Sequence, residues 1–274
     1  MLFRSHPDLV IIHGDRVEAL ACSLVCVTNA VRCAHVEGGE VSGTIDEQFR
    51  HCNTKLASVH LVSSEDARAR VIRLGELPEA IHVIGSPELD IHGQPSGVTI
   101  EQVMDRYDIR SRDYGICVFH PVTSERDTIG QQAFELFGAL KESNRYFVVI
   151  LPNNDPGSEA IQQVIETLPY DQFRVLPSMR FSFFSELMRN ACVIIGNSSM
   201  GVREAPFLGV PSLDVGTRQF NRGEAPSLWH STAHDRSTIG RFLTEAWGQR
   251  FPRSQNFGTG NAAQRFVELL NDDA

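Results

Sequence analysis

The chain has 274 residues, which is long enough for two domains or for one large domain with a full-sized hydrophobic core. Apolar residues make up 42% of it and charged residues 22%, so the composition excludes a disordered or fibrous protein. The formal net charge of -9 argues against nucleic acid or an anionic membrane as a partner, because both would require a basic surface.

The sequence also shows no sign of a membrane, metal or disulfide role. Its longest apolar runs, "DLVIIHG" and "YFVVILP", are far shorter than a membrane span, and the first residues lack a signal-peptide core. The six cysteines include no C-x-x-C pair, and the ten histidines show no metal-ligand spacing. We therefore expect a cytoplasmic protein with reduced cysteines and no bound metal.

Short apolar runs rich in β-branched residues alternate with helical patterns from one end of the chain to the other. The first four runs are "LVIIH", "VRCAHV", "VHLVS" and "IHVIG". Five more follow: "GICVF", "YFVVIL", "FRVLP", "CVIIG" and "PSLDV". This alternation predicts an α/β fold in which βαβ units build parallel sheets.

A break in the alternation indicates where two domains meet. The stretch "GSPELDIHGQPSG", between Gly85 and Asp113, is rich in Gly, Pro and Ser. We expect a partial Rossmann-like domain over 1–92, a second Rossmann-like domain over 93–250, and a closing helix in 251–274 that packs back on the body. The two sheets are expected to face a central cleft, and the first domain, with four strands, to lack its first βα region.

Charged side chains follow several of the predicted strands. Asp15 follows the first strand, Glu37 the second, and His120 the first strand of the second domain, and in open parallel sheets ligands bind beyond these strand ends. Asp46 opens a helical stretch, with Arg50 one turn later on the same face. Either aspartate could instead cap a helix, and His120 could be a core histidine. Because these strand ends are expected to face one crevice, we interpret the residues as one site.

The segment "GNSSMGVREAPFLGVP" follows a buried strand and predicts a phosphate-binding turn. Asn197, Ser198 and Ser199 come directly after the strand. A helix should begin at Gly201 or the next residue, because Pro206 fits only an early turn. Backbone N–H groups, serine hydroxyls and the helix dipole would then face an anion, although an ordinary glycine-rich turn is the alternative.

Other polar residues complete the predicted nucleotide site. Glu204 lies in the first turn of the expected helix, where it would repel phosphate but accept hydrogen bonds from a ribose diol. Arg218 and Arg222 follow the next strand and are candidate phosphate ligands, with solvated surface arginines as the alternative. Asn153 follows the strand "YFVVIL" at the same predicted edge.

As a set, these segments resemble the hydrolysing UDP-N-acetylglucosamine 2-epimerases of bacterial sialic-acid synthesis. The segments are "HGDRVEALA", "HVEGGEVSGTIDEQFRH", "VIGSPELD", "FHPVTSE", "LPNNDPGSE" and "GNSSMGVREAPFLGVPSLDVGTRQFNR", and their order and spacing extend the resemblance over nearly the whole chain. The resemblance implies a two-domain GT-B fold and a homo-oligomer, a dimer or tetramer. It also implies conversion of UDP-GlcNAc to N-acetylmannosamine and UDP through 2-acetamidoglucal, with no metal or redox cofactor.

The resemblance also assigns roles to single residues. Asp15, Glu37 and Asp46 correspond to the family's catalytic carboxylates, and His120 to its active-site histidine near the leaving diphosphate. The residues that correspond to its UDP-binding turn are Ser198, Ser199 and Glu204. The family's N-terminal βα region, with its Gly-Thr-Arg loop, has no counterpart in this sequence.

Three other functions remain open from the sequence. The chain could be an inactive remnant that binds a UDP-sugar, a hydrolysing epimerase of the UDP-diacetamidobacillosamine type, or a GT-B glycosyltransferase. Turnover of UDP-GlcNAc without an acceptor separates the first and third from the leading hypothesis.

Overall fold

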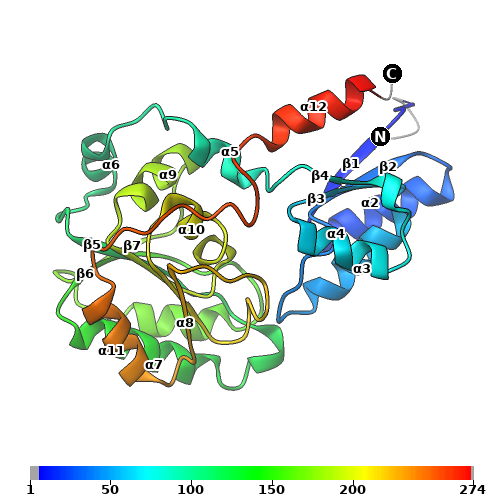
Figure 1. Ribbon diagram of the computed structural model, residues 1–274. Coiled ribbons are helices and arrows are strands. Elements are labelled where there is room, and N and C mark those ends of the chain that lie inside the picture. The colour runs from blue at the N-terminus through cyan, green and yellow to red at the C-terminus, as the bar shows by residue number, and fades with distance from the viewer. Residues whose placement is uncertain (1–5, 273–274) are drawn as a thin grey trace. The chain divides into compact units, whose positions relative to one another are not determined.

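The computed structural model describes residues 6–272 (Figure 1). The chain divides into two compact units. Unit 1 consists of Met1–Gly93 together with Asn256–Ala274, and unit 2 of Gln94–Gln255. Each unit contains one parallel β-sheet with helices between its strands, so the expected α/β fold with parallel sheets is confirmed.

The sheet of unit 1 has four strands in the spatial order β1-β2-β3-β4, which is also their order in the chain. All three strand pairs are parallel, as expected where each connection contains a helix. The strands are β1 (Val10–His13), β2 (Cys33–Val36), β3 (Val59–Val62) and β4 (Ile81–Val83). The helical segments are α2 (Val17–Thr28), α3 (Asp46–Leu56), α4 (Glu65–Arg73), η1 (Pro78–Ala80), α5 (Glu88–Gly93) and α12 (Ala262–Asp272).

The two faces of this sheet pack against different helices, because successive strand residues point to opposite faces. On one face Cys33 of β2 packs with Cys26 of α2. On the other face Ala34 packs with Ala262 of α12. Ile11 is the register partner of Ala34 and so lies on the α12 face, yet it is 50% exposed. The α12 face of β1 is therefore only partly covered.

The sheet of unit 2 has six parallel strands in the order β10-β9-β8-β5-β6-β7. The strands are β5 (Tyr114–Val118), β6 (Tyr146–Ile150), β7 (Phe173–Leu176), β8 (Val193–Gly196), β9 (Ser212–Val215) and β10 (Leu228–Ser231). The helical segments are α6 (Ile100–Tyr107), η2 (Thr123–Glu125), α7 (Ile129–Glu142), α8 (Ser158–Ile165), α9 (Phe181–Asn190), η3 (Ser199–Gly201), α10 (Glu204–Leu208) and α11 (Arg236–Glu245).

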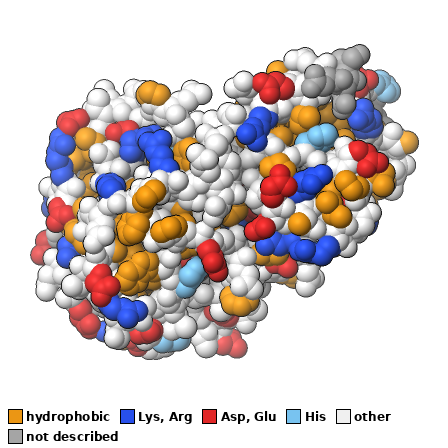
Figure 2. Space-filling model, viewed as in Figure 1, with side chains coloured by type: hydrophobic (Ala, Val, Ile, Leu, Met, Phe, Trp, Pro, Cys, Tyr) orange, Lys and Arg blue, Asp and Glu red, His pale blue; other side chains and the backbone are white. Residues whose placement is uncertain are grey.

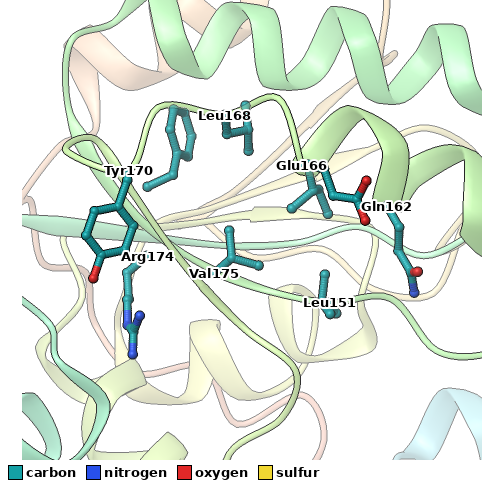
Figure 3. Close-up of a pocket in the computed structure, with 9 residues that line it drawn as sticks. Leu151, Gln162, Glu166, Leu168, Tyr170, Arg174 and Val175 are labelled. Carbon is teal, nitrogen blue, oxygen red and sulfur yellow. The ribbon is translucent and has the colours of Figure 1, made fainter.

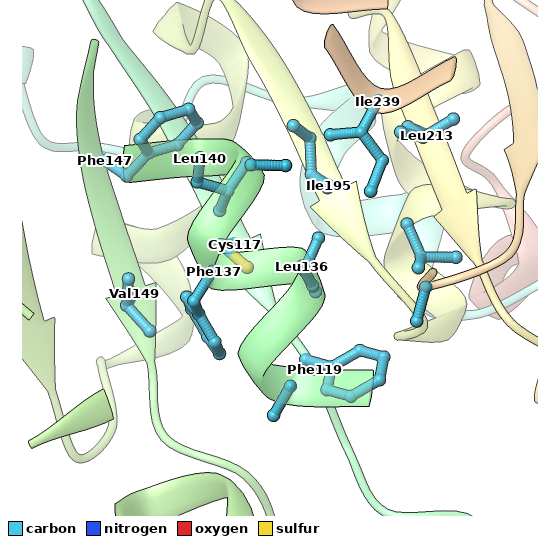
Figure 4. Packing of buried hydrophobic residues seen from close by; sticks show 14 of the residues in the cluster. Cys117, Phe119, Leu136, Phe137, Leu140, Phe147, Val149, Ile195, Leu213 and Ile239 are labelled. Atoms are coloured by element: carbon cyan, nitrogen blue, oxygen red, sulfur yellow. The ribbon is translucent and has the colours of Figure 1, made fainter. Parts of the chain in front are cut away.

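The main core of unit 2 lies between its sheet and helices α7, α8 and α11. Figure 4 shows side chains of α7, among them Leu136 and Phe137, packed against strand residues such as Val149 and Ile195. On the other side of the sheet, the Tyr114 hydroxyl of β5 donates to the Leu187 carbonyl of α9 at 2.9 Å. Strands β5 and β8 are buried on both faces, which explains their unbroken apolar runs.

Nine of the ten strands were predicted from the sequence, and two details of unit 2 were not. Strand β10 was missed because "LWHS" contains neither an apolar run nor a β-branched residue. The helix expected to begin near Gly201 begins instead at Glu204, after the short η3 turn. Pro206 is therefore the third residue of α10, still within its first turn.

Charges of both signs are mixed over the face of the molecule seen in Figure 2, where Lys and Arg side chains alternate with Asp and Glu. This distribution fits the acidic net charge, because no continuous basic area is visible on that face. Within residues 6–272, no helix has both the length and the apolar character needed to cross a membrane.

Candidate functional site

Asp15 lies in the loop that follows β1, and its carboxylate pairs with the Arg50 guanidinium of α3. Arg50 is 2% exposed and also donates to the Glu40 carbonyl at 3.1 Å. The predicted alternative, a helix cap, is not observed: the N-cap of α2 is Arg16, which makes no capping bond through its side chain. Arg50 is a predicted substrate ligand, but its side chain is buried and its partner is the Asp15 carboxylate.

A buried hydrogen-bond network fixes the backbone just before Asp15. His35 of β2 bonds the Gly14 carbonyl through Nε2 at 2.9 Å and the Thr54 hydroxyl through Nδ1 at 3.1 Å. The Asn53 amide also donates to the Gly14 carbonyl, at 3.2 Å. Burial lowers the pKa of His35 to about 4, so the ring is neutral at pH 7 and carries its hydrogen on Nε2.

Glu37 follows β2 in a left-handed backbone conformation, with φ at +67°, and it is 5% exposed. The Ser86 hydroxyl donates to its Oε1 at 3.1 Å, and His13 Nε2 lies 3.4 Å from its Oε2. Gly39, two residues later, has a φ of +77°, and a Cβ there would lie 2.3 Å from the Ala67 carbonyl oxygen. Close packing against α4 thus explains the second glycine of "EGG".

Asp46 is the first residue of α3 and accepts a hydrogen bond from the Thr44 hydroxyl at 3.1 Å. It does not share an ion pair with Arg50, since that arginine reaches Asp15 instead. Unit 1 therefore places Asp15 and Glu37 at the carboxyl ends of neighbouring strands, and Asp46 at the start of the helix after the second.

The structure adds residues to this edge that sequence spacing did not indicate. One possible metal-ligand atom from each of His13, Glu37 and Glu88 lies within 4.8 Å of the others, close enough to share a metal ion. The same groups also contact one another, because His13 Nε2 lies 3.4 Å from Glu37 Oε2 and 3.6 Å from Glu88 Oε1. They come from β1, the end of β2 and α5, three segments far apart in the chain. No local motif could have joined them.

In unit 2, His120 and Asn197 hold the ends of adjacent strands together. The His120 N–H donates to Asn197 Oδ1 at 2.7 Å, and Asn197 Nδ2 donates to the His120 carbonyl at 2.8 Å. Their strands, β5 and β8, pair up to Val118 and Gly196. Gly196 cannot be replaced easily, because a Cβ would lie 1.9 Å from the Val118 carbonyl oxygen.

The His120 ring is oriented by the backbone of Asn153, whose N–H donates to Nδ1 at 3.2 Å. The ring hydrogen is therefore on Nε2. Burial, followed by the nearby positive charge of Arg218, lowers the pKa of His120 to about 4. The neutral ring at pH 7 is a hydrogen-bond donor suited to an anionic oxygen.

The loop after β9 closes around Asn197. Arg218 Nη1 and Gln219 Nε2 donate to the Asn197 carbonyl at 3.3 and 2.9 Å. Arg222 Nη1 donates to Gln219 Oε1 at 3.0 Å. The structure thus brings both predicted arginines to the edge that carries His120, and buried Gln219 is a linking residue that sequence reasoning missed.

The serine turn after β8 is less helical than predicted. Ser198 and Ser199 are half-buried, and Ser199 accepts a contact from Arg203 Nη2 at 3.4 Å. Gly201 ends the η3 turn, and Glu204 is buried as the first residue of α10, which has five residues. A helix this short has a weak dipole, so an anion at this turn would depend mainly on hydroxyl and arginine donors.

A separate cavity of about 300 Å³ lies beside the edge strand β7 and helix α8 of unit 2. Figure 3 shows Tyr170, Arg174 and Val175 along it, with Gln162 and Glu166 on the helix side. None of the residues predicted for the site lines this cavity, so it is distinct from the strand-end cluster.

Comparison with known proteins relates this geometry to one family. The sequence profile of UDP-N-acetylglucosamine 2-epimerase matches residues 1–271. The UDP-N-acetylglucosamine 2-epimerase of Neisseria meningitidis serogroup B is 40% identical over 269 residues, 97% of this chain and 71% of the relative. A Legionella pneumophila UDP-N,N'-diacetylbacillosamine 2-epimerase (hydrolyzing) is 32% identical, over 96% of this chain and 71% of its own.

Solved structures support the same fold. A UDP-GlcNAc 2-epimerase from Neisseria meningitidis, bound to UDP-GlcNAc, matches with a TM-score of 0.84 at 19% identity, covering 99% of this chain and 78% of that one. Staphylococcus aureus MnaA with UDP matches with a TM-score of 0.80 at 20% identity, over 99% and 75%. The expected GT-B-like pair of Rossmann-like domains is confirmed, and the extent of the sequence matches shows that the chain belongs to the UDP-N-acetylglucosamine 2-epimerase family.

Proposed function

We propose that this chain is a hydrolysing epimerase that converts UDP-GlcNAc and water to N-acetylmannosamine and UDP. The observation that carries the proposal is the placement of Asp15 and Glu37 at the ends of adjacent parallel strands, with Asp46 at the start of the next helix. A sugar nucleotide bound at this edge would meet several carboxylates, which both halves of the reaction need.

The carboxylates of unit 1 would act on the sugar. One removes the proton from C2 while the C1–oxygen bond to the diphosphate breaks, which gives 2-acetamidoglucal and UDP. Water then adds its oxygen to C1, and a carboxyl group returns a proton to C2 on the opposite face. Glu37 suits proton transfer because it is nearly buried and held by Ser86 and His13. Asp15, paired with Arg50, suits a fixed negative charge beside the oxocarbenium-like state.

Unit 2 would hold the nucleotide. The Nε2–H of neutral His120, the guanidinium groups of Arg218 and Arg222, and the hydroxyls of Ser198 and Ser199 are donors for a diphosphate. Three further residues of the set complete the proposal: Glu204 accepts hydrogen bonds from the ribose hydroxyls, and Asn197 with Asn153 keeps His120 in place.

The names of relatives favour the hydrolysing reaction. The Legionella pneumophila relative is a hydrolyzing enzyme, and a polysialic acid biosynthesis protein, P7, of Escherichia coli is 32% identical over 81% of this chain and 58% of its own. We extend this to a role in making a sialic acid or a related sugar acid. A diacetylbacillosamine nucleotide is the second candidate substrate, favoured by the Legionella pneumophila similarity.

Product analysis tests the proposal. The chain is incubated with UDP-GlcNAc, and the products are identified by proton NMR with UDP release followed in parallel. Free N-acetylmannosamine and UDP in equal amounts are expected. UDP-N-acetylmannosamine without free UDP would show a non-hydrolysing epimerase, and UDP binding without any product would show a nucleotide-binding protein. Preference for UDP-diacetylbacillosamine in the same assay would favour the second substrate.

A further inference from the structure

Ser86 lies between two glutamates at the edge of the unit 1 sheet. It follows β4, is almost fully buried, and its hydroxyl lies 2.6 Å from Glu88 Oε2 and 3.1 Å from Glu37 Oε1. A serine hydroxyl has one hydrogen to donate. The two carboxylates therefore share the single hydrogen of Ser86, with the shorter contact to Glu88, and one of them, Glu37, is a proposed catalytic group.

The backbone of Ser86 is held by the C-terminal segment of the same unit. Its N–H donates to the Phe257 carbonyl at 2.7 Å. Next to this bond, Gly85 and Gly258 cross with φ values of +90° and +110°, and a Cβ on Gly258 would lie 2.8 Å from the Gly85 Cα. The crossing is so close that only glycines fit it, which leaves Ser86 little freedom to move.

A second contact anchors the far end of this segment. The Asp90 carboxylate of α5 accepts hydrogen bonds from the Ala262 and Ala263 N–H groups, both at 2.8 Å, and so caps the start of α12. The C-terminal segment therefore contacts this part of unit 1 at two points, at Ser86 through Phe257 and at Asp90 of α5 through the start of α12.

We propose that Ser86 is a positioning residue for Glu37, kept in place by this crossing of the C-terminal segment. The inference rests on the proposed function, since it concerns the aim of the Glu37 carboxylate at the sugar. The Ser86 hydroxyl lies 3.1 Å from Oε1 of the nearly buried Glu37 and so favours one direction of that carboxylate. Misplacing a reacting group by about 1 Å can reduce turnover on the order of 100-fold.

Kinetics of Ser86→Ala provide the first test. Turnover of UDP-GlcNAc should fall by roughly 10- to 100-fold, while KM stays within about twofold, because Ser86 acts on the aim of Glu37 and not on nucleotide binding. Unchanged turnover, or an effect confined to KM, would overturn the proposal.

Ser63→Ala is the matched control. Ser63 is also a buried serine of unit 1 that donates to a buried glutamate, Glu40, at 2.7 Å. The Ser63→Ala variant loses the same kind of hydrogen bond as Ser86→Ala. It should therefore lower stability to a similar extent and leave turnover within about twofold of the parent chain. An equal loss of turnover in both variants would show a general effect of destabilisation and contradict the positioning role.

A double-mutant cycle separates this inference from the proposed function. Urea unfolding is measured for the parent chain, Ser86→Ala, Glu37→Gln and the double variant. If the two side chains are in direct contact, the unfolding equilibrium constant of the double variant should differ by more than about twofold from the value expected if the two single effects were independent. Additive changes would overturn the proposal even for an active chain. If the parent chain releases no UDP, the proposed function fails while this cycle still tests the Ser86–Glu37 contact.

Discussion

At the scale of single residues, Glu37 is the group on which the proposed chemistry depends most. We predict that Glu37→Gln lowers turnover of UDP-GlcNAc by roughly 100- to 10,000-fold, because an amide cannot transfer the C2 proton. The affinity for UDP, measured by calorimetry, should stay within about threefold of the parent, since this side chain belongs to unit 1 and acts on the sugar.

An exposed glutamate of the same unit provides the control for this variant. Glu65→Gln, in the first turn of α4, should leave turnover unchanged. Full activity of Glu37→Gln would remove Glu37 from the mechanism, and Ser86 would then lose its proposed target.

Glu204 is expected to act on binding instead of chemistry. Glu204→Ala should weaken UDP by about tenfold or more, because a buried carboxylate that accepts two ribose hydroxyls contributes charge-assisted hydrogen bonds. Calorimetry with UDP measures this directly. Glu159→Ala, which changes an exposed glutamate in the first turn of α8, is the control and should bind UDP normally. Equal affinity in both variants would leave Glu204 with a purely structural role.

The sequence predicted part of this residue-level arrangement. Asp15 and Glu37 were found because each directly follows an apolar run, and parallel strands bring such positions to one edge. Ser86 and His13 were not found, since their contacts with Glu37 join separate segments. The burial of Arg50 was also beyond prediction, because a charged residue at helical spacing is usually solvated.

At the scale of elements, α2 has an unusual amount of apolar surface. Val17, Leu24 and Val27 lie on one side of the helix and are 59%, 48% and 49% exposed, respectively. Such a surface favours self-association, in line with the expected oligomer. We predict that Leu24→Lys combined with Val27→Lys shifts the chain toward monomer in analytical ultracentrifugation.

A similar exposed leucine outside α2 controls for charge alone. Leu77→Lys adds a lysine to the loop before η1, where the parent side chain is 63% exposed. It should leave the oligomeric state unchanged. A shift of equal size in this variant would mean that net charge, and not the α2 surface, determines association.

The cap of α12 by Asp90 gives a second prediction for an element. Asp90→Ala should destabilise unit 1 by about 1 kcal/mol, since two N–H groups at the start of α12 lose their acceptor. Hydrogen exchange should become faster in α12. Asp235→Ala removes the corresponding cap of α11 and should affect unit 2 instead. Unchanged exchange in α12 would show that packing alone holds the helix.

Elements were predictable where local pattern and tertiary structure agreed. Strands β1 to β9 were all found because each lies in a short stretch rich in apolar and β-branched residues, unbroken in fully buried strands such as β5 and β8. Strand β10 is recognisable only through its pairing with β9, as in Leu228 with Ser212. The start of α10 was placed too early because a 3-10 turn and an α-helix share the same local residue preferences.

At the scale of the whole molecule, each unit contains a histidine that folding keeps neutral, buried His35 in unit 1 and half-buried His120 in unit 2. The pKa of His35 in unit 1 and that of His120 in unit 2 are both lowered from 6.5 to about 4, mainly by burial. Between pH 4 and pH 6.5 each histidine binds more protons in the unfolded chain than in the folded one. Its contribution to the free energy of unfolding is therefore fully present above about pH 6.5 and is lost as the pH falls toward 4. Each histidine contributes a slope of up to about 1.4 kcal/mol per pH unit.

Urea unfolding between pH 7 and pH 4 measures this loss. His35→Gln should flatten the pH dependence of unit 1, and His120→Gln that of unit 2. His230 works in the opposite direction, because its hydrogen bond with Asp214 raises its pKa and adds stability on the acidic side. Stability that stays constant from pH 7 to pH 4 would contradict the neutral state of both buried rings.

The return of residues 256–272 to unit 1 affects how the protein is made. A ribosome releases unit 2 in one continuous piece, whereas the sheet of unit 1 waits for α12, which is made after unit 2. Until then the Ala34 face of that sheet and the backbone of Ser86 lack their final contacts. Residues 1–93 therefore reach their final packing only after residues 256–272 have been made, and so do the proposed acids, which all lie in that first segment.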